Sequence, residues 1–156
     1  MSQQDPIRLF IAHTWEESDD YTRIFEYLES ARNFYYRNMS TPEHRPAADV
    51  ESRHEDLRAQ IRLAEILIAP ASLYRHQSEW LMFMLHFAKS CKKPVLVVRP
   101  FGVQAIVPRA LTELADDVVD WEERGLVDAI RRLARQENTA RYDVIEFNPD
   151  DFKLED

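Results

Sequence analysis

The residues best suited to chemistry in this chain follow its first apolar run, or lie in a later predicted loop and at the start of the helix after it. His13, Thr14 and Trp15 offer an imidazole, a hydroxyl and an indole at three consecutive positions. Tyr74 and Trp80 add two aromatic rings further along the chain. Aromatic faces stack on nucleobases, and imidazole and hydroxyl groups bind phosphate or sugar oxygens. Residue type alone therefore makes these five side chains candidates for binding a nucleotide-like ligand.

Two of these candidates also have a structural interpretation. His13 lies in a predicted strand-end loop, where it either contacts a ligand phosphate or caps the following helix. Trp80 starts an apolar stripe that continues through Met84, Phe87 and Cys91 at helical spacing, which is typical of a core face. Both alternatives stay open at the level of sequence.

Several catalytic and cofactor classes are excluded by the sequence. Gly102 and Gly125 are the only glycines, so the chain has neither a Walker loop nor a Gly-x-Gly-x-x-Gly fingerprint. The Gly-x-Ser-x-Gly motif of nucleophile-elbow hydrolases is also absent. One cysteine and five scattered histidines predict no metal site. A phosphoacceptor domain needs an aspartate at the end of the third strand, where Ala69 and Pro70 stand.

Charge and hydropathy restrict the partners. The formal net charge is −8, and no basic cluster is longer than Lys92-Lys93, so we expect no nucleic-acid or anionic membrane partner. The sequence contains no run of eighteen apolar residues, and MSQQDP at the N-terminus lacks the features of a signal peptide. We therefore expect a cytoplasmic protein.

The elements that must position the candidate residues alternate along the chain. The stretch 78–102 is the clearest, because a helical stripe is followed by Pro94 and by the β-branched run Val95–Val98. Similar patterns predict strands at 7–12, 34–39, 66–69 and 117–121, and helices at 19–30, from Ser52 onward, at 109–115 and through Leu126, Ile130 and Leu133. Ser18 is the expected cap of the first helix, and Ser52 with Glu55 forms a capping box for the second.

Five strands alternating with five helices predict one α/β domain over 1–136, a five-stranded parallel sheet with helices on both faces. Residues 137–156 are an acidic C-terminal extension that is apolar enough to pack back onto the domain. Ligands of such sheets bind beyond the carboxyl ends of the strands. The loops to consider are therefore 13–18, 39–52, 70–78 and 100–108.

Short motifs along this pattern resemble a known family. The motifs are Phe10-Ile11-Ala12-His13-Thr14-Trp15, Ser18-Asp19-Asp20-Tyr21, Ser78-Glu79-Trp80, Lys93-Pro94, Pro100-x-Gly102, Pro108 and Asp120-Trp121. In order and spacing they resemble the bacterial TIR-like family, which has a flavodoxin-like fold and includes the TIR-like subunit of the Thoeris anti-phage defence system. The resemblance covers residues 7–135. It implies signalling through a protein assembly, and in active members cleavage of NAD to an ADP-ribose-type nucleotide.

The resemblance also identifies the position that matters most for catalysis. Active members carry a glutamate four residues after the helix tryptophan, and its carboxylate stabilises the oxocarbenium-like ribose of the transition state. Here that position is Met84, which has no charge. Glu79 lies roughly 140° around the helix from this position, and Glu16, Glu17 or Glu51 would have to supply a carboxylate from another loop. A second departure is Ala12, where related sequences have serine.

The same helix carries more apolar residues than one buried stripe needs. Trp80 to Leu85 reads WLMFML, so Met82 and Phe83 are expected to project from other faces and to mark a partner surface. The alternative is that loops or the extension cover them. We therefore expect a homo-oligomer, or a TIR or effector protein as partner.

Two hypotheses of function follow. The first is a TIR-like interaction or nucleotide-binding module that has lost glycohydrolase chemistry, with NAD or an ADP-ribose-type nucleotide as its ligand. The second is an active NAD hydrolase or cyclase whose carboxylate comes from elsewhere in the chain. Met84 favours the first.

Overall fold

Five parallel strands form one sheet at the centre of the computed structural model, which describes residues 1–102 and 106–136. Their order across the sheet is β2-β1-β3-β4-β5. The strands are β1 Ile7–Ile11, β2 Tyr36–Asn38, β3 Ile66–Pro70, β4 Val95–Val98 and β5 Asp117–Val119. In the central pair, Leu9, Phe10 and Ile11 of β1 lie opposite Ile66, Leu67 and Ile68 of β3. The first strand thus lies inside the sheet, between the second and the third.

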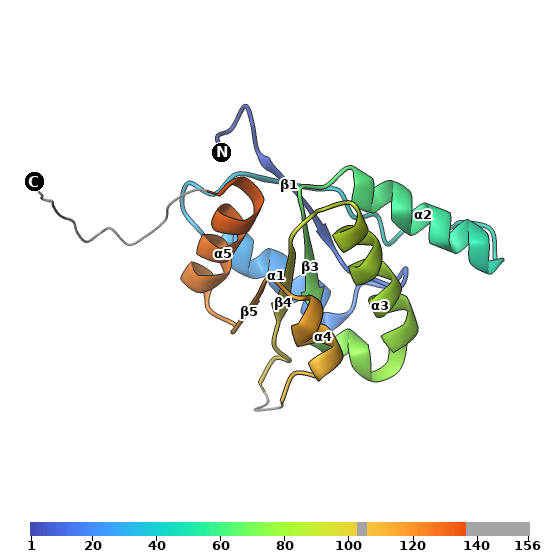
Figure 1. Ribbon diagram of the computed structural model, residues 1–156. Helices are drawn as coiled ribbons and strands as arrows, with labels where there is room; N and C mark the ends of the chain where they lie inside the picture. The colour runs from blue at the N-terminus through green and yellow to red at the C-terminus, as the bar shows by residue number, and fades with distance from the viewer. Residues whose placement is uncertain (103–105, 137–156) are drawn as a thin grey trace, which may run out of the picture.

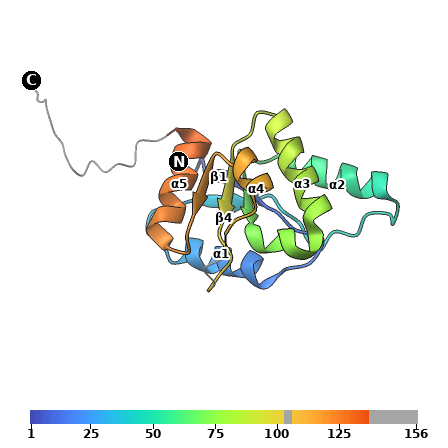
Figure 2. The ribbon, with the colours of Figure 1, turned by 60° about the horizontal axis from the view of Figure 1, so that its bottom comes forward.

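Helices cover both faces of this sheet (Figure 1). They are α1 Asp19–Glu29, α2 Val50–Arg62, α3 Tyr74–Ser90, α4 Arg109–Leu114 and α5 Glu123–Arg135, with a 3₁₀ turn, η1 Ala71–Leu73, directly before α3. Helices α1 and α5 pack on one face, and α2, α3 and α4 pack on the other, as the second view also shows (Figure 2).

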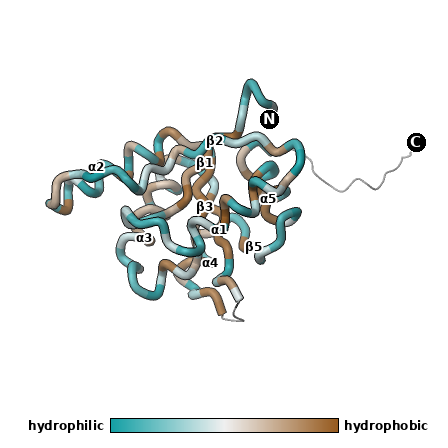
Figure 3. Tube along the Cα trace, turned by 180° about the vertical axis from the view of Figure 1, so that it is seen from behind, coloured by the Kyte–Doolittle hydropathy of each residue, from teal (hydrophilic) through white to brown (hydrophobic). Residues whose placement is uncertain are grey.

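Alternate residues of each strand supply the two halves of the core. Phe10 of β1 and Leu67 of β3 pack against α2 and α3, whereas Leu9 and Ile66 pack against α1 and α5. All four have at most 1% of their surface exposed. Such strands read as nearly continuous apolar runs because both of their faces are buried, and they form the brown centre of the tube in Figure 3.

The predicted fold class is confirmed: the described chain is a single α/β domain with a five-stranded parallel sheet and helices on both faces. The strand order 2-1-3-4-5 is that of the flavodoxin-like fold. The strand Val95–Val98 has its predicted bounds, and Ser18 caps α1 as predicted, its side chain accepting a hydrogen bond from the Tyr21 backbone N–H. The strands β2 and β5 are shorter than predicted.

The predicted capping box of the second helix is wrong. Helix α2 begins at Val50, and its cap is Asp49, whose carboxylate accepts a hydrogen bond from the Ser52 backbone N–H at 2.9 Å. The Ser52 hydroxyl also donates to Asp49, at 2.9 Å. Aspartate caps as well as serine does, and it comes first along the chain, so the helix starts two residues earlier.

The predicted loop before α3 and the predicted buried stripe of α3 are also wrong. The stretch 71–76 is helical instead of a loop, although a break at Gln77, with non-helical φ −131° and ψ 40°, directly precedes Ser78, where the sequence predicted the helix to start. The buried residues of α3 are Leu81, Met84, Leu85 and Ala88. Trp80 and Phe87 are partly buried at the margin of this stripe, and Cys91 caps the helix end, also partly exposed. The buried face is therefore rotated from the predicted one, and only Met84 belongs to both.

Met82 and Phe83 do not form an exposed patch, which corrects the sequence prediction. Both are partly buried against the core. The His54 ring stacks on Phe83 with centroids 4.1 Å apart, and the Arg58 guanidinium lies 5.4 Å from the Phe83 ring centroid. Helix α2 thus covers Phe83 with the His54 ring and the Arg58 guanidinium.

This packing predicts that Phe83→Glu destabilises the monomer. A carboxylate placed under His54 and Arg58 loses the ring contacts and is partly desolvated, so we expect a loss of about 2–4 kcal/mol in the free energy of unfolding. Urea denaturation followed by circular dichroism, with light scattering on the same samples, measures it.

The matched control is Ile106→Glu, because Ile106 is 93% exposed and its replacement should change stability by less than about 0.5 kcal/mol. A Phe83→Glu protein that keeps wild-type stability but dissociates a dimer would restore the partner-surface interpretation.

An ion-pair cluster ties the last helix to the amino edge of the sheet. Arg135, in the last turn of α5, binds both carboxylate oxygens of Glu65 and also pairs with Asp5 at 3.0 Å. The Arg8 backbone N–H donates to Glu65 at 3.0 Å. Partial burial disfavours the charge on Glu65, but the hydrogen bonds from Arg135 and Arg8 outweigh it and lower the pKa of Glu65 to about 2.

We therefore predict that Glu65→Gln lowers the free energy of unfolding by about 1.5–3 kcal/mol at pH 7. Because the folded pKa lies below the ordinary value of 4.5, the stabilisation is present above about pH 4.5 and is lost as the pH falls toward 2. Urea denaturation of both proteins between pH 7 and pH 2.5 should show the difference shrinking. A difference that stays constant over this range would contradict the assignment.

The predicted extension, 137–156, lies outside the described residues, so its packing stays a prediction. No helix within 1–102 or 106–136 is long and apolar enough to cross a membrane.

Candidate functional site

Two connections of the chain meet at the carboxyl edge of the sheet. One runs from β1 to α1, and the other is η1 with the first turn of α3, directly after β3. They lie side by side because β1 and β3 are hydrogen-bonded neighbours. The strand order also reverses here, since β2 lies on one side of β1 and β3 on the other. Doubly wound sheets bind their ligands at this kind of switch point.

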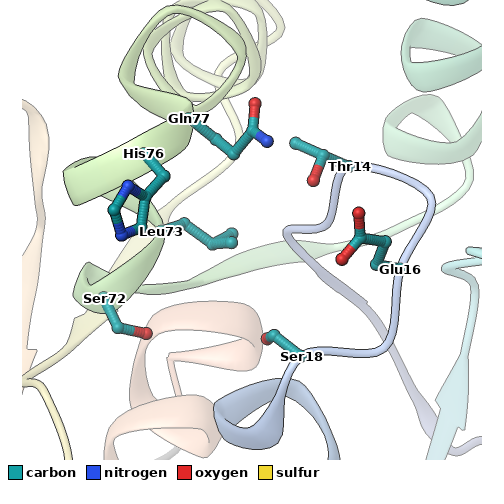
Figure 4. A pocket seen from close by; sticks show the side chains of 7 residues that line it. All are labelled: Thr14, Glu16, Ser18, Ser72, Leu73, His76 and Gln77. Carbon is teal, nitrogen blue, oxygen red and sulfur yellow. The ribbon is translucent and has the colours of Figure 1, made fainter.

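A cleft of about 220 Å³ opens between the two connections (Figure 4). Six of its seven lining residues have polar side chains; the seven are Thr14, Glu16, Ser18, Ser72, Leu73, His76 and Gln77. Three of these residues come from the β1 connection and four from η1 and α3, and the two groups face each other. Because ligand pockets usually measure about 300–1,000 Å³, this cleft accommodates only part of a dinucleotide.

The charge of the lining limits what the cleft can hold. Glu16 contributes a carboxylate, whereas neither lysine nor arginine is among the lining residues. The N-terminus of α1 adjoins the cleft at Ser18, but Asp19 and Asp20 in its first turn already offset the positive end of the helix dipole. The cleft therefore suits a hydroxyl-rich or cationic group better than a bare phosphate.

Asp20 holds the two walls of the cleft together. It is 7% exposed, and its carboxylate accepts a hydrogen bond from the Ser72 hydroxyl at 2.8 Å and pairs with Arg23. Arg23 in turn lies over the Phe101 ring, 3.8 Å from its centroid. Ser72 is thus a lining residue whose orientation is fixed by a buried carboxylate on the opposite wall.

His13 is a buried structural residue beneath the β1 connection. It is 1% exposed, and its Nδ1 accepts a hydrogen bond from the Trp15 backbone N–H at 3.0 Å. The proton therefore lies on Nε2, which donates to Gln60 Oε1 at 2.8 Å. Burial lowers the pKa of His13 and outweighs the opposing effect of the Gln60 hydrogen bond, so the imidazole is neutral at pH 7.

The network continues from Gln60 to a partly buried carboxylate on α2. Gln60 Oε1 also accepts a hydrogen bond from the Thr41 backbone N–H, and its amide donates to Asp56 Oδ2 at 2.9 Å. Asp56 further accepts the Trp15 indole N–H at 2.8 Å and contacts His44 Nδ1. The network thereby connects the β1 and β2 loops with α2.

The backbone of Trp15 is strained. Its φ of 63° lies in the left-handed region, where residues with a bulky side chain are uncommon. The indole is held by Asp56 and packs edge-on against Trp80, with ring centroids 5.4 Å apart. The strained turn directs Trp15 toward α2 and α3 and leaves Thr14 and Glu16 at the cleft.

The candidate residues predicted from the sequence do not all lie at the cleft. Only Thr14 lines the cleft. Trp15, Tyr74 and Trp80 are partly buried against the core, and His13 neither lines the cleft nor caps α1, since Ser18 does. Met84 is 0% exposed within the core.

The lining residues Ser72, Leu73, His76 and Gln77 were not singled out, although the sequence does predict the loops 13–18 and 70–78 as the place of the site. These types are common in ordinary loops and helices, so residue type gave no signal. Among the carboxylates considered as substitutes, Glu16 and Glu17 are both exposed but only Glu16 lines the cleft, and Glu51 pairs with Arg58 at 2.9 Å.

Comparison with known proteins supports the fold. No family model matches the sequence, and no curated protein does. The chain is similar to the solved structure of a protein from Burkholderia pseudomallei K96243 described as pilus assembly-related, with 22% identity, 83% of this chain and 90% of that chain covered, and a TM-score of 0.51. A 3-dehydroquinate dehydratase-like protein from Bifidobacterium longum matches at 12% identity over 87% and 98% of the two chains, with a TM-score of 0.46. The first similarity supports only the shared fold, and the second is too weak to support a conclusion.

We predict that Asp56→Ala lowers the free energy of unfolding by about 2–4 kcal/mol. The substitution leaves the Trp15 indole and the Gln60 amide without their buried acceptor. Chemical denaturation followed by tryptophan fluorescence measures the loss. Glu55→Ala is the matched control, because Glu55 is the neighbouring acid on α2, forms only exposed ion pairs, and should matter by less than about 1 kcal/mol. Equal effects of the two substitutions would show that the network is not what holds the loops.

Proposed function

We propose that this chain is a TIR-like module that binds a nucleotide-like ligand in the cleft between β1 and β3 and does not hydrolyse NAD. The observation that carries the proposal is the polar cleft at the switch point of the sheet, lined from both connections. The motif resemblance supports a role in signalling, within cytoplasmic prokaryotic anti-phage defence.

The absence of glycohydrolase chemistry is argued from Met84. The family's glutamate position is occupied here by a thioether with 0% exposure, packed in the core beside Leu81 and Leu85. It offers no charge to a developing oxocarbenium ion and no surface to a ligand. Loss of a preorganised electrostatic contact costs about 10²- to 10³-fold in rate in comparable cases.

One observation favours the second candidate function, an NAD hydrolase or cyclase. Glu16 places a carboxylate in the cleft from the opposite wall. In such a reaction the bond between ribose C1′ and the nicotinamide nitrogen breaks, and nicotinamide leaves with the electron pair. Water then adds at C1′ and releases a proton, or a hydroxyl or ring nitrogen of the same molecule closes the ring. Glu16 would stabilise the cationic ribose between these steps.

Association with a second copy or with a partner protein stays part of the proposal, but Met82 and Phe83 no longer supply its contact surface. A homo-oligomer or a TIR or effector partner is the expectation from the resemblance, but Met82 and Phe83 are covered by the chain itself. Among the described residues, the exposed large apolar side chains are Val50, Leu63, Phe101 and Ile106.

Calorimetry with NAD, ADP-ribose and its cyclic isomers, together with a nicotinamide-release assay, tests the proposal. We expect binding of at least one of these ligands at or below millimolar concentration and no release of nicotinamide above background. Glu16→Gln should weaken binding by at least about tenfold, because a hydrogen bond to a charged group is worth roughly 1.5–3 kcal/mol.

Glu17→Gln is the matched control, since this neighbouring carboxylate is exposed like Glu16 but does not line the cleft. Nicotinamide release that Glu16→Gln abolishes and Glu17→Gln leaves intact would establish the second function instead. Failure of all these ligands to bind at millimolar concentration would contradict both.

A further inference from the structure

A second cleft lies at the opposite, amino edge of the sheet and is rich in cations. It measures about 400 Å³ and is lined by Lys89, Lys92, Lys93, Pro94, Asp116, Arg132, Leu133 and Gln136. Three of the chain's four lysines therefore gather at one place in a protein whose formal net charge is −8. Such a concentration of positive charge attracts an anionic partner.

The cations of this cleft are only partly neutralised by the described residues. Lys89 contacts both oxygens of Asp116, at 2.9 and 3.0 Å, and Arg132 pairs with Asp117 at 2.6 Å. Lys93 donates to the backbone oxygens of Arg62 and Ala64 at the end of α2, which adds no negative charge.

Lys92 differs from its neighbours. It lies in the turn after α3 with a φ of 60°, is exposed, and makes no ion pair with the described part of the chain. The cleft thus keeps an excess of positive charge centred on Lys92.

An anionic segment follows the cleft residue Gln136 directly in the sequence. Helix α5 ends at Arg135 and is followed by its C-cap Gln136, which has a left-handed φ of 55° and is one of the lining residues. The twenty residues that follow, 137–156, contain seven acidic and two basic side chains, a formal charge of −5. Their sequence also includes Tyr142, Ile145 and Phe147, which match the apolar parts of Pro94 and Leu133 in the cleft.

We propose that residues 137–156 bind in this cleft in cis, with their carboxylates on Lys92 and its neighbours. The segment starts at the cleft wall, so the tether holds its acidic groups at a high effective concentration near the lysines. Single exposed ion pairs are weak and screened by salt, so binding depends on several contacts together and weakens as ionic strength rises. The proposal concerns the edge of the sheet opposite to the ligand cleft and does not depend on the proposed function.

Zero-length carbodiimide cross-linking of the full chain, with peptide mapping by mass spectrometry, tests this directly. We expect amide bonds between Lys92 and carboxylates of 137–156 in a monomer-sized product, reduced at least fivefold in 1 M sodium chloride. The pair of Lys89 and Asp116, 2.9 Å apart, supplies an internal positive control in the same sample.

Two variants of Lys92 separate charge from reactivity. Lys92→Arg keeps the cation and removes the reactive amine, so links to Lys89 or Lys93 should persist. Lys92→Glu should reduce those links at least threefold. Links between Lys89 and Asp116 without any to 137–156 would overturn the proposal, and so would links to 137–156 that occur only in a dimer-sized product, which would assign the cleft to a second copy of the chain.

Discussion

The parallel pairing of β1 with β3 is the interaction on which the rest of the structure depends. It joins two strands buried on both faces, and it leaves β1 with β2 on one side and β3 on the other. The connections that leave these two strands must therefore emerge next to each other. A cleft at this edge follows from the topology, and the side chains of the two connections decide only its chemistry.

The floor of that edge is polar and buried, which is costly unless every group is satisfied. His13, Gln60 and Asp56 satisfy one another and hold the β1 loop, the β2 loop and α2 together. On the other side of the cleft, Asp20 connects α1 to η1 through Ser72. These hydrogen bonds hold the loops that carry the lining residues in one conformation. A ligand can therefore bind without a free-energy cost for ordering the loops.

The sheet was predictable from the sequence because its signal is local. A continuous apolar run such as Val95–Val98 is buried on both faces only in a sheet that is covered by helices on both sides. The alternation of strands with helices then allows few topologies. The rotation of α3 was not predictable in the same way. Trp80 and Phe87 fit the same helical stripe as Met84, and the choice of Leu81 and Ala88 as buried neighbours depends on how closely α3 approaches the sheet and on the cover that α2 supplies. The site was predicted to the level of two loops, whereas Ser72, His76 and Gln77 act only through their position opposite Glu16.

Backbone amide chemical-shift mapping by NMR, with NAD or ADP-ribose added to the 18.5 kDa chain, tests the central claim most directly. That claim is that the cleft between the β1 and β3 connections is where the ligand binds. The account predicts that the largest shifts cluster in 14–18 and 72–77, with smaller shifts at Asp20 and in the network around Gln60. Shifts centred instead on the lysines of 89–93 at the opposite edge, or saturable binding that leaves 14–18 and 72–77 unperturbed, would contradict it.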